Sequence, residues 1–175
     1  MKQPGLIQVY TGNGKGKTTA SLGLALRAVG HGFRVLMIQF MKDNETYGET
    51  KSSACLTGLE VIKVGRDVLV DPKNPDPIDK KLARDGWEMA REAILSREYQ
   101  VVILDELNVA MATGLLPIEE VAAFLRDNQR QQVEIVLTGR YAPQAILDMA
   151  DLITEMQEIR HPFQAGVPAR QGIDF

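Results

Sequence analysis

A glycine-rich stretch with two lysines near the N-terminus constrains the fold of this chain more than any other feature. Thr11-Gly12-Asn13-Gly14-Lys15-Gly16-Lys17-Thr18-Thr19 directly follows the apolar run Leu6 to Tyr10 and opens a long helical pattern. Glycine permits positive φ and a close approach of the backbone, so successive N–H groups can converge on phosphate oxygens at the start of a helix. The stretch therefore predicts a strand–loop–helix unit that binds phosphate groups.

The register of this loop departs by one residue from the usual P-loop pattern G-x-x-x-x-G-K-[ST]. Counting back from Gly16-Lys17-Thr18 places Thr11 at the first glycine position, with Gly12 one place later. The dinucleotide-binding pattern G-x-G-x-x-G fits less well, because the glycines here are spaced two apart. A tight turn without a ligand would explain the glycines but not Gly16-Lys17-Thr18 at a helix start. A phosphate-binding loop is the favoured interpretation.

Apolar runs rich in β-branched residues alternate with helical patterns along the chain. The later runs are Val35 to Phe40, Leu59 to Val64, Val101 to Leu104 and Val133 to Leu137. Helical spacing occurs over Thr19 to Val29, and Gly30-His31-Gly32 ends this helix. A second helix is indicated by the apolar stripe Ala83, Trp87, Ala90 and Ile94. A third, with Pro117 in its first turn, is indicated by the stripe Ile118, Val121, Ala122 and Leu125. The alternation predicts an α/β fold, of the P-loop NTPase-like (RecA-like) three-layer type, with a mostly parallel central sheet of five or six strands. We expect Trp87 to pack in the core rather than stack on a ligand.

Size, charge and cysteine content limit the classes of protein that this chain can represent. Its 175 residues predict a single domain, 1–175, and a net charge of −3 argues against a general nucleic-acid or anionic-membrane binder. No apolar stretch approaches the roughly 20 residues that span a bilayer, and no secretory signal is apparent, so a soluble cytoplasmic protein is expected. The single Cys55 excludes an intramolecular disulfide, and we expect it to be a small buried side chain.

A second candidate for chemistry is the run Val101 to Leu104, which ends in the two carboxylates Asp105 and Glu106. Ligands of parallel sheets collect at the carboxyl ends of the strands. Mg²⁺ prefers oxygen ligands, so the Thr18 hydroxyl, one of these carboxylates and phosphate oxygens would form a reasonable set. The alternative for Asp105 is a helix N-cap. Joined to the glycine loop, the pair favours a nucleotide–Mg²⁺ site.

Three further features leave alternatives open. Arg140, in Thr138-Gly139-Arg140 after the last apolar run, can contact phosphate or remain a solvated surface residue. The proline-rich segment Asp71 to Pro77 is a loop, either a lid or a plain excursion. The two histidines, His31 and His161, show no metal-ligand spacing, so zinc is not expected.

Taken together, these motifs resemble the P-loop type of ATP:corrinoid adenosyltransferase, the cob(I)yrinic acid a,c-diamide adenosyltransferase family. The resemblance covers nearly the whole chain and is carried by residues 10–19, 27–32, 39–42, 104–107, 116–121, 138–140, 161–167 and 171–175. The loop variant with the extra Lys15 and the Gly-Ile-Asp-aromatic terminus are specific to that family. The shifted loop register is thus a feature that the family itself has.

The resemblance implies transfer of the 5′-deoxyadenosyl group of ATP to Co(I) of a reduced corrinoid, with tripolyphosphate leaving, in adenosylcobalamin biosynthesis or salvage. Co(I) is already the nucleophile, so no acid/base residue is assigned. In this family ATP is bound opposite to its orientation in ordinary P-loop hydrolases. The partners implied are ATP, cobalamin or cobyrinic acid a,c-diamide, an unidentified electron donor and a second copy in a homodimer, for which a face with Phe124 and Leu125 is one candidate. Neither a nucleic acid nor a membrane is implied.

The resemblance also implies roles for individual residues. Lys15 and Lys17 would stabilise negative charge. Thr18 and Glu106 would bind Mg²⁺ or Mn²⁺, with Asp105 close by. The ATP-binding set is Gly12, Asn13, Gly14, Lys15, Gly16, Lys17, Thr18, Thr19 and Arg140.

The chain departs from the family pattern after the third apolar run. Better-known members have a Gly-Phe-Thr-Trp element whose aromatic residues help remove the lower axial ligand of the corrin; here the sequence is Gly65-Arg66-Asp67-Val68-Leu69. By position, Arg66, Val68 and Leu69 are expected to contact the corrinoid, without those aromatic side chains.

Two other functions compete with adenosyl transfer. An ordinary P-loop ATPase or small-molecule kinase would release ADP, with Glu106 orienting water or an acceptor hydroxyl. A nucleotide-responsive binding module would bind ATP tightly without turnover. Spacing alone favours phosphoryl transfer, the common use of such loops, whereas the whole-chain resemblance favours adenosyl transfer.

Overall fold

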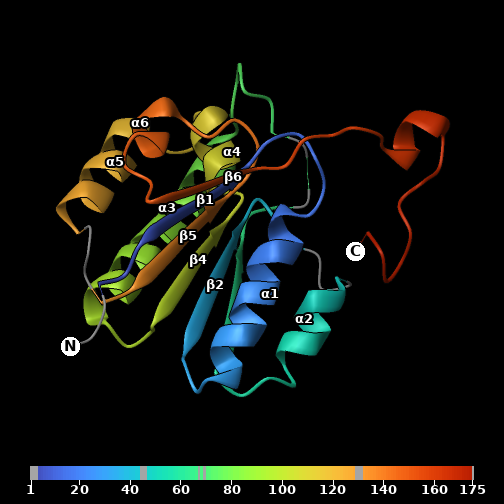
Figure 1. Ribbon diagram of the computed structural model, residues 1–175. Helices are drawn as coiled ribbons and strands as arrows, with labels where there is room; N and C mark the ends of the chain where they lie inside the picture. The colour runs from blue at the N-terminus through green and yellow to red at the C-terminus, as the bar shows by residue number, and fades with distance from the viewer. Residues whose placement is uncertain (1–3, 44–46, 67, 69, 129–131, 175) are drawn as a thin grey trace.

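The computed structural model describes residues 4–43, 47–66, 68, 70–128 and 132–174 (Figure 1). The strands are β1 (Ile7–Thr11), β2 (Val35–Phe40), β3 (Leu59–Val64), β4 (Val101–Asp105), β5 (Glu134–Thr138) and β6 (Leu152–Glu155). The helices are α1 (Lys17–Gly30), α2 (Gly48–Ser53), α3 (Pro77–Ser96), α4 (Leu107–Ala112), α5 (Ile118–Asp127) and α6 (Gln144–Leu147), with a short 3₁₀ turn η1 (Pro162–Ala165).

The strands form one six-stranded sheet in the order β3-β2-β4-β5-β1-β6. Every pairing between neighbours is parallel, so the carboxyl ends of the strands lie along one edge. Strand β5 separates β1, which precedes the glycine loop, from β4, which ends in Asp105. The predicted α/β fold with a parallel central sheet is confirmed, and the strand count is at the upper limit of the expectation.

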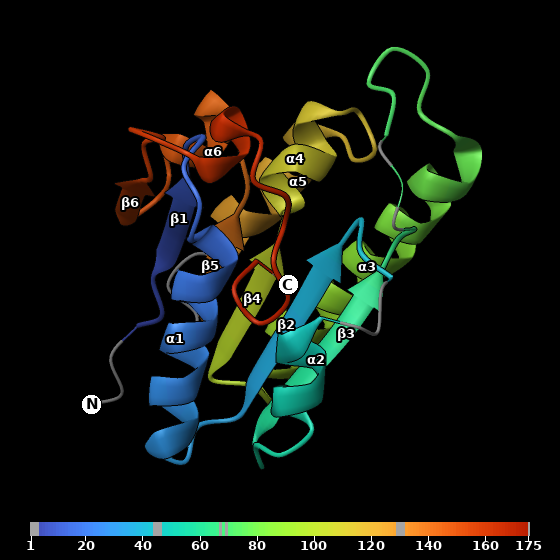
Figure 2. The same cartoon turned by 90° about the vertical axis from the view of Figure 1, so that its right-hand side faces the viewer.

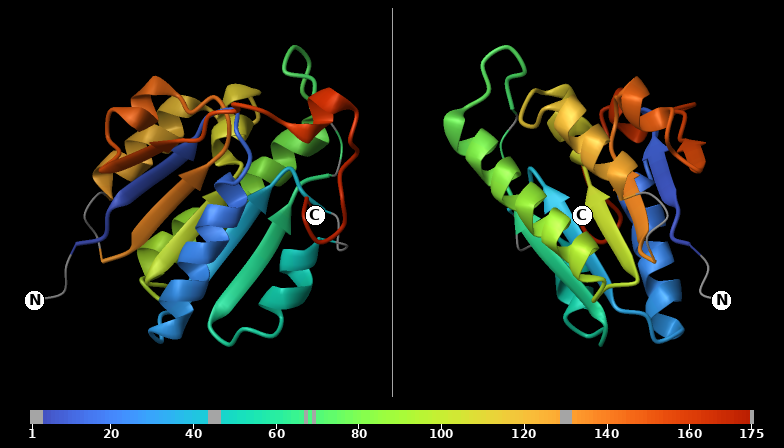
Figure 3. Two further views of the ribbon diagram at one scale, coloured as in Figure 1. Left: turned by 45° about the vertical axis from the view of Figure 1, so that its right-hand side comes forward. Right: turned by 90° about the vertical axis from the view of Figure 1, so that its left-hand side faces the viewer.

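Helices cover both faces of the sheet, as Figures 1 and 3 show: α1 and α2 lie on one face, and α3 to α6 lie on the other. The larger apolar cluster fills the α3–α6 side and includes Trp87, Leu125 and the inward residues of β2 and β4. A smaller cluster lies under α1, around Ala25, Met37 and Val136. The two clusters use alternate residues of the same strands, because successive side chains in a strand point to opposite faces.

Both predicted helical stripes face the core. Ala83, Trp87, Ala90 and Ile94 of α3 are buried, as are Val121, Ala122 and Leu125 of α5, while Ile118 is partly buried against that core. Trp87 is fully buried, as predicted; its ring meets Phe124 edge-on at 5.4 Å, and its Nε1 donates to Glu120 at 3.2 Å. Phe124 and Leu125 therefore pack within the chain, and this face gives no support to a dimer contact.

Two local expectations need correction. Cys55 is exposed, not buried, because it follows the short polar helix α2 in a turn rather than lying on an apolar face. Pro117 precedes α5 as its N-cap instead of lying in its first turn. Strand β6 was not expected from the sequence, since its four residues lie at the sheet edge and all are exposed. Among the described helices, none combines the length and apolar character that a membrane crossing requires.

Candidate functional site

The carboxyl edge of the sheet gathers the motifs that the sequence singled out. The glycine loop follows β1, the pair Asp105 and Glu106 ends β4, and Thr138 ends β5 between them. Figure 2 shows the strands pointing to the same end of the molecule, where α1 begins. Residues more than a hundred positions apart in sequence thus meet because parallel strands end at one edge.

Glycine is required at positions 12 and 14 because another segment of the backbone passes close to both. A Cβ at Gly12, where φ is +91°, would lie 2.4 Å from the carbonyl oxygen of Met156, and one at Gly14 would lie 2.8 Å from that of Gln157. The Gly14 N–H donates to the Met156 carbonyl at 2.6 Å. The segment after β6 therefore passes directly over the loop, and the Gly14 N–H is already used and does not face a phosphate.

Helix α1 begins at Lys17, after Gly16 adopts a φ of 115°. The first N–H groups of a helix have no partner within it, so those at the start of α1 are free to bind an anion. A Cβ at Gly16 would meet only the sulfur of Met156, at 3.5 Å. The positive φ, rather than a close neighbour, is the reason for glycine at this position.

The Lys17 side chain folds back over the loop and is only 7% exposed. Its Nζ donates to the carbonyl oxygens of Gly12 and Gly14, both at 2.7 Å. Burial lowers the pKa of Lys17 below its ordinary value, although the nearby Glu106 opposes that shift. The Lys17 ammonium thus holds the loop closed by bonding to two of its carbonyl oxygens. A bound phosphate would replace these oxygens as the partner of Nζ.

Asp105 is fully buried and surrounded by donors. Thr18 Oγ1 and Thr138 Oγ1 donate to its Oδ1 at 2.9 and 2.6 Å, while Gln39 Nε2 and Lys42 Nζ lie 3.1 and 2.8 Å from its Oδ2. The N-cap alternative for Asp105 is wrong, because Glu106 is the residue that precedes α4. Both oxygens of Asp105 are occupied, which leaves it little capacity to bind a metal directly.

Glu106 has the opposite character. Its backbone adopts a φ of 64°, its N–H donates to Thr138 Oγ1 at 3.0 Å, and its side chain lines the cavity described below. Burial, reinforced by the charge of Asp105, raises the pKa of Glu106, while Lys42, Lys17 and Arg140 oppose the rise. A carboxylate in this setting is stabilised by a cation.

These residues fit a divalent cation that is bound together with phosphate. Thr18 Oγ1 donates its hydroxyl hydrogen to Asp105 Oδ1, so the lone pairs of Oγ1 are left for a cation. No cluster of three or more His, Cys, Asp or Glu side chains suited to a metal occurs in the described part of the chain. Mg²⁺ usually binds through one or two protein oxygens plus substrate phosphates, which is what Thr18 and Glu106 can offer.

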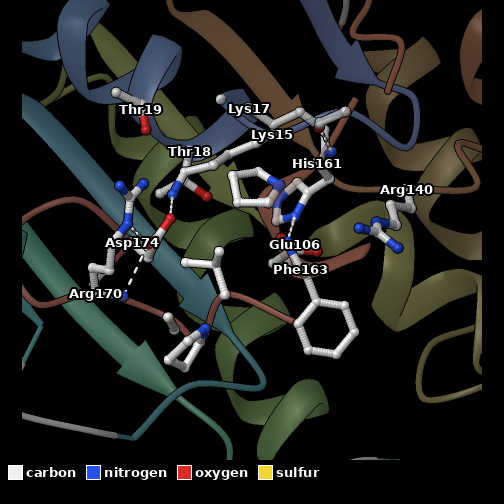
Figure 4. A pocket seen from close by; sticks show the side chains of 16 residues that line it. Lys15, Lys17, Thr18, Thr19, Glu106, Arg140, His161, Phe163, Arg170 and Asp174 are labelled. Carbon is white, nitrogen blue, oxygen red and sulfur yellow. Dashed lines mark hydrogen bonds and ion pairs between the residues drawn. The ribbon is translucent and has the colours of Figure 1, made fainter. Parts of the chain in front are cut away.

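The C-terminal segment returns across the carboxyl edge of the sheet to the side of α1 (Figures 1 and 2). Asp174 forms an ion pair with Lys15, whose Nζ also donates to the Ile173 carbonyl at 3.0 Å. The other oxygen of Asp174 accepts from Arg170 Nε at 3.2 Å (Figure 4). The Asp174 carboxylate thus pairs with Lys15, the lysine that we expect to bind the triphosphate.

Between the loop and this segment lies a cavity of about 380 Å³. Its lining is polar on the loop side and partly apolar on the side of His161, Phe163 and Val167. Of the predicted ATP-binding residues, the cavity brings together Gly14, Lys15, Gly16, Lys17, Thr18, Thr19 and Arg140, with Glu106 beside them. Its size lies at the low end for a small-molecule site.

Asn13 lies apart from this cavity. It lines a second hollow with Tyr141, Glu155 and Glu158 on the other side of Arg140, which borders both. Gly12 lines neither of these two hollows and acts through its carbonyl contact with Lys17. The two hollows differ in charge: basic residues outnumber acidic ones in the lining of the first, whereas Glu155 and Glu158 outnumber Arg140 in the lining of the second.

Of the predicted corrinoid residues, Arg66 and Val68 line neither of these two hollows. Arg66 pairs with Asp79 through Nε and Nη2, both at 2.7 Å, and its Nη2 lies 2.8 Å from Asp76. Arg66 therefore ties the loop after β3 to the start of α3. Val68 is 52% exposed, and Leu69 lies outside the described residues.

Sequence reasoning assigned no site role to several residues that shape the site. Gln39, Lys42 and Thr138 surround Asp105, and His161, Phe163, Arg170 and Asp174 close the cavity. Lys42 and Thr138 both follow apolar runs, so their place at the carboxyl edge was available from the sequence. The C-terminal residues carried no such signal, because no periodic pattern ties them to the loop.

The fold has its glycine loop between β1 and α1 and an acidic pair at the end of β4, with β5 between these two strands, and this arrangement defines a P-loop α/β protein. The crystal structure of the flagellar accessory protein FlaH from Methanocaldococcus jannaschii has the same fold, with a TM-score of 0.60 over 87% of this chain and 71% of that chain, at 15% identity.

Sequence comparison then gives the family. The model of the ATP:corrinoid adenosyltransferase BtuR/CobO/CobP family matches residues 3–175, and the chain belongs to this family. The corrinoid adenosyltransferase of Escherichia coli K12 is 39% identical, over 98% of this chain and 86% of that protein. The corrinoid adenosyltransferase of a Sinorhizobium species is 35% identical, over 99% of this chain and 81% of that protein. The one from Salmonella typhimurium, named CobA, is 36% identical, over 99% of this chain and 87% of that protein.

Proposed function

We propose that this protein transfers the 5′-deoxyadenosyl group of ATP to the cobalt of a reduced corrinoid and releases tripolyphosphate. The observation that carries the proposal is the family match over residues 3–175, which includes every element of the loop site. Co(I) supplies the electron pair of the new Co–C bond, and the C5′–O bond of ATP breaks as its electrons leave with the triphosphate. No proton transfer is needed, which agrees with the absence of any assigned base.

In this reaction the chain's own residues bind and neutralise charge. Negative charge grows on the triphosphate as the C5′–O bond breaks, and Lys15, Lys17 and the N–H groups at the start of α1, all of which line the cavity, would stabilise it. Thr18 and Glu106 would hold Mg²⁺ or Mn²⁺, which adds positive charge at the phosphates. Arg140 extends the cationic side of the cavity.

One observation supports the alternative function, that of an ATPase or small-molecule kinase. Glu106 lines the cavity with a raised pKa, as expected for a base that orients water or a hydroxyl. The two functions give different products, since hydrolysis or phosphoryl transfer yields ADP and adenosyl transfer yields tripolyphosphate.

An anaerobic assay with ATP, Mg²⁺ and a chemically reduced corrinoid tests the proposal. We expect tripolyphosphate and an adenosylated corrinoid from the wild type, and a loss of about a hundredfold or more in Lys17→Ala, because a charge on the leaving group is no longer stabilised. Lys80→Ala, an exposed lysine on α3, is the matched control and should keep full activity. ADP as the only product would overturn the proposal, and normal turnover by Lys17→Ala would show that the loop is not the triphosphate site.

The partners follow the same proposal. We infer either cobalamin or cobyrinic acid a,c-diamide as the acceptor, a separate electron donor, and a homodimer in solution. Comparing kcat/KM for the two corrinoids identifies the preferred one, and sedimentation equilibrium gives the mass of the assembly.

A further inference from the structure

Lys42 lies just after β2, outside every residue set assigned above to ATP, metal or corrinoid. Its Nζ lies 2.8 Å from Asp105 Oδ2, and the side chains of Lys42 and Asp105 are 17% and 0% exposed. The pairing follows from sheet register, because Gln39 of β2 is the direct neighbour of Asp105 in β4 and Lys42 follows three residues later. The contact joins the ends of two adjacent strands.

Lys42 is the only charged donor among the four that contact Asp105 in the described structure. Thr18 and Thr138 donate hydroxyl groups to Oδ1, and Gln39 donates an amide N–H to Oδ2. A buried carboxylate without a positive partner is strongly disfavoured. Burial lowers the pKa of Lys42, but the charge and hydrogen bond of Asp105, with Glu106 and Glu49, outweigh burial and raise it overall. The Lys42 ammonium and the Gln39 amide together hold Oδ2 of Asp105 in place.

The position of Asp105 decides how Thr18 faces the cavity. Thr18 Oγ1 donates its hydroxyl hydrogen to Oδ1 of Asp105, so the lone pairs of Oγ1 are left for a cation. Lys42 holds the other oxygen, Oδ2. Without Lys42, Oδ2 would lose its charged partner and could compete with Glu106 for the cation.

Lys42 is not among the residues that line the cavity, whereas Thr18 and Glu106 are. Its ammonium lies on the oxygen of Asp105 that Thr18 does not contact, and its Nζ lies 5.8 Å from the centre of the Tyr47 ring. Lys42 therefore contacts the site through Asp105 and not through the cavity wall. Its charge also acts on Glu106 over a longer distance.

We propose that Lys42 is a positioning residue of the metal–triphosphate site: by pairing with Asp105 it fixes Thr18 as a cation ligand and leaves Glu106, rather than Asp105, to contact the cation. This inference rests on the proposed function, because it presumes that a divalent cation binds with ATP at this loop. Its ligand class is a divalent cation held jointly by protein oxygens and triphosphate.

The test measures Mn²⁺ binding in the presence of ATP and without corrinoid, by electron paramagnetic resonance of free Mn²⁺. We expect Lys42→Met to weaken Mn²⁺ binding about tenfold to a hundredfold, the usual effect of losing a partner behind a metal ligand, and Lys42→Arg to restore most of it. ATP binding without metal should change much less. Lys51→Met, which removes an exposed lysine on α2, is the matched control and should bind Mn²⁺ like the wild type.

A double-mutant cycle with Asp105→Asn separates positioning from a general effect of charge. Because Lys42 contacts the site through Asp105, the change Lys42→Met should have a much smaller effect on Mn²⁺ affinity in the Asp105→Asn background, where only its charge near Glu106 is lost. This double variant also lacks the unpaired buried charge, so it tests the inference even if Lys42→Met alone folds poorly; circular dichroism establishes which variants fold. The wild-type Mn²⁺ affinity in Lys42→Met, or an equal loss in both backgrounds, would overturn the inference.

Failure of the proposed function gives a different result. If the wild type releases ADP instead of tripolyphosphate, the reaction is not adenosyl transfer, yet Mn²⁺ affinity still reports whether Lys42 positions the site. If the product is tripolyphosphate and Lys42→Met binds Mn²⁺ normally, only the positioning role is wrong.

Discussion

At the scale of single residues, the glycines of the loop serve two different purposes. Gly16 is required by its backbone conformation, whereas Gly12 and Gly14 also leave room for the carbonyl groups of Met156 and Gln157. The spacing of the glycines therefore reports a contact with the segment after β6 as well as the approach of a phosphate. A P-loop pattern in sequence combines these two requirements and does not separate them.

Replacing Gly14 by alanine should destabilise the protein before any ligand is added. The new Cβ would lie 2.8 Å from backbone atoms of Met156 and Gln157, which cannot rotate away. We expect a loss of about 1–3 kcal/mol in the free energy of unfolding, measured by urea denaturation.

The matched control is Gly23→Ala, since a Cβ at Gly23 on α1 meets nothing within 4 Å. Alanine in a helix interior is favoured over glycine by about 1 kcal/mol, so this variant should be more stable than the wild type. Equal stability changes in the two variants would contradict the close contact at Gly14.

At the scale of elements, the C-terminal segment is the part of the site with the weakest attachment. It adds His161, Phe163 and Asp174 to the cavity wall, yet Phe163 is 75% exposed and Ile173 63%. It is linked to the loop by Lys15, which forms an ion pair with Asp174 and donates to the Ile173 carbonyl. Exposed ion pairs contribute little to stability, so the segment can be displaced at low cost.

Triphosphate and the Asp174 carboxylate compete for Lys15 because both are anions. We expect Asp174→Asn to bind ATP about twofold to fivefold more tightly than the wild type, as removal of one partly exposed ion pair allows. Isothermal titration calorimetry with ATP measures this change directly.

Asp85→Asn removes a carboxylate on α3 that pairs with Lys81, far from the loop, and should leave ATP affinity unchanged. Weaker ATP binding by Asp174→Asn would mean that Asp174 supports the nucleotide instead of competing with it.

At the scale of the whole molecule, a single sheet joins both apolar clusters. The larger cluster and the smaller one under α1 share strands β2, β4 and β5, so neither can unfold without exposing the other. This arrangement supports the proposal that residues 1–175 form one domain.

One cooperative transition is therefore expected on urea unfolding. Fluorescence of the single tryptophan, Trp87, reports the α3–α5 core, and far-ultraviolet circular dichroism reports all helices and strands. The two curves should coincide, and saturating ATP with Mg²⁺ should shift both together, by about 2.7 kcal/mol at a ligand concentration of a hundred times Kd. Separate midpoints for the two probes would contradict a single domain.

Much of the fold was determined by the sequence itself. Apolar runs predicted β2 and β3 with their observed ends, and the helical stripes of α3 and α5 both face the core, because burial of apolar surface selects apolar residues at the positions that face inward. The segment β6 and the short helices α2, α4 and α6 carried too few residues for such a pattern. Residue type and spacing also identified the loop, Thr18 and the pair Asp105 and Glu106 as a candidate site. The choice of Glu106 within the pair and the phosphate role of Arg140 came from the family resemblance.

The tertiary structure decided how these residues are used. Only the strand order placed Lys42, Gln39 and Thr138 around Asp105, and so separated a buried, fully bonded aspartate from a glutamate that faces the cavity. Only the path of the chain after β6 brought Met156 onto Gly14 and Asp174 onto Lys15. Local sequence sets the conformation of each segment, but contacts between segments far apart in the chain depend on the packing of the whole sheet.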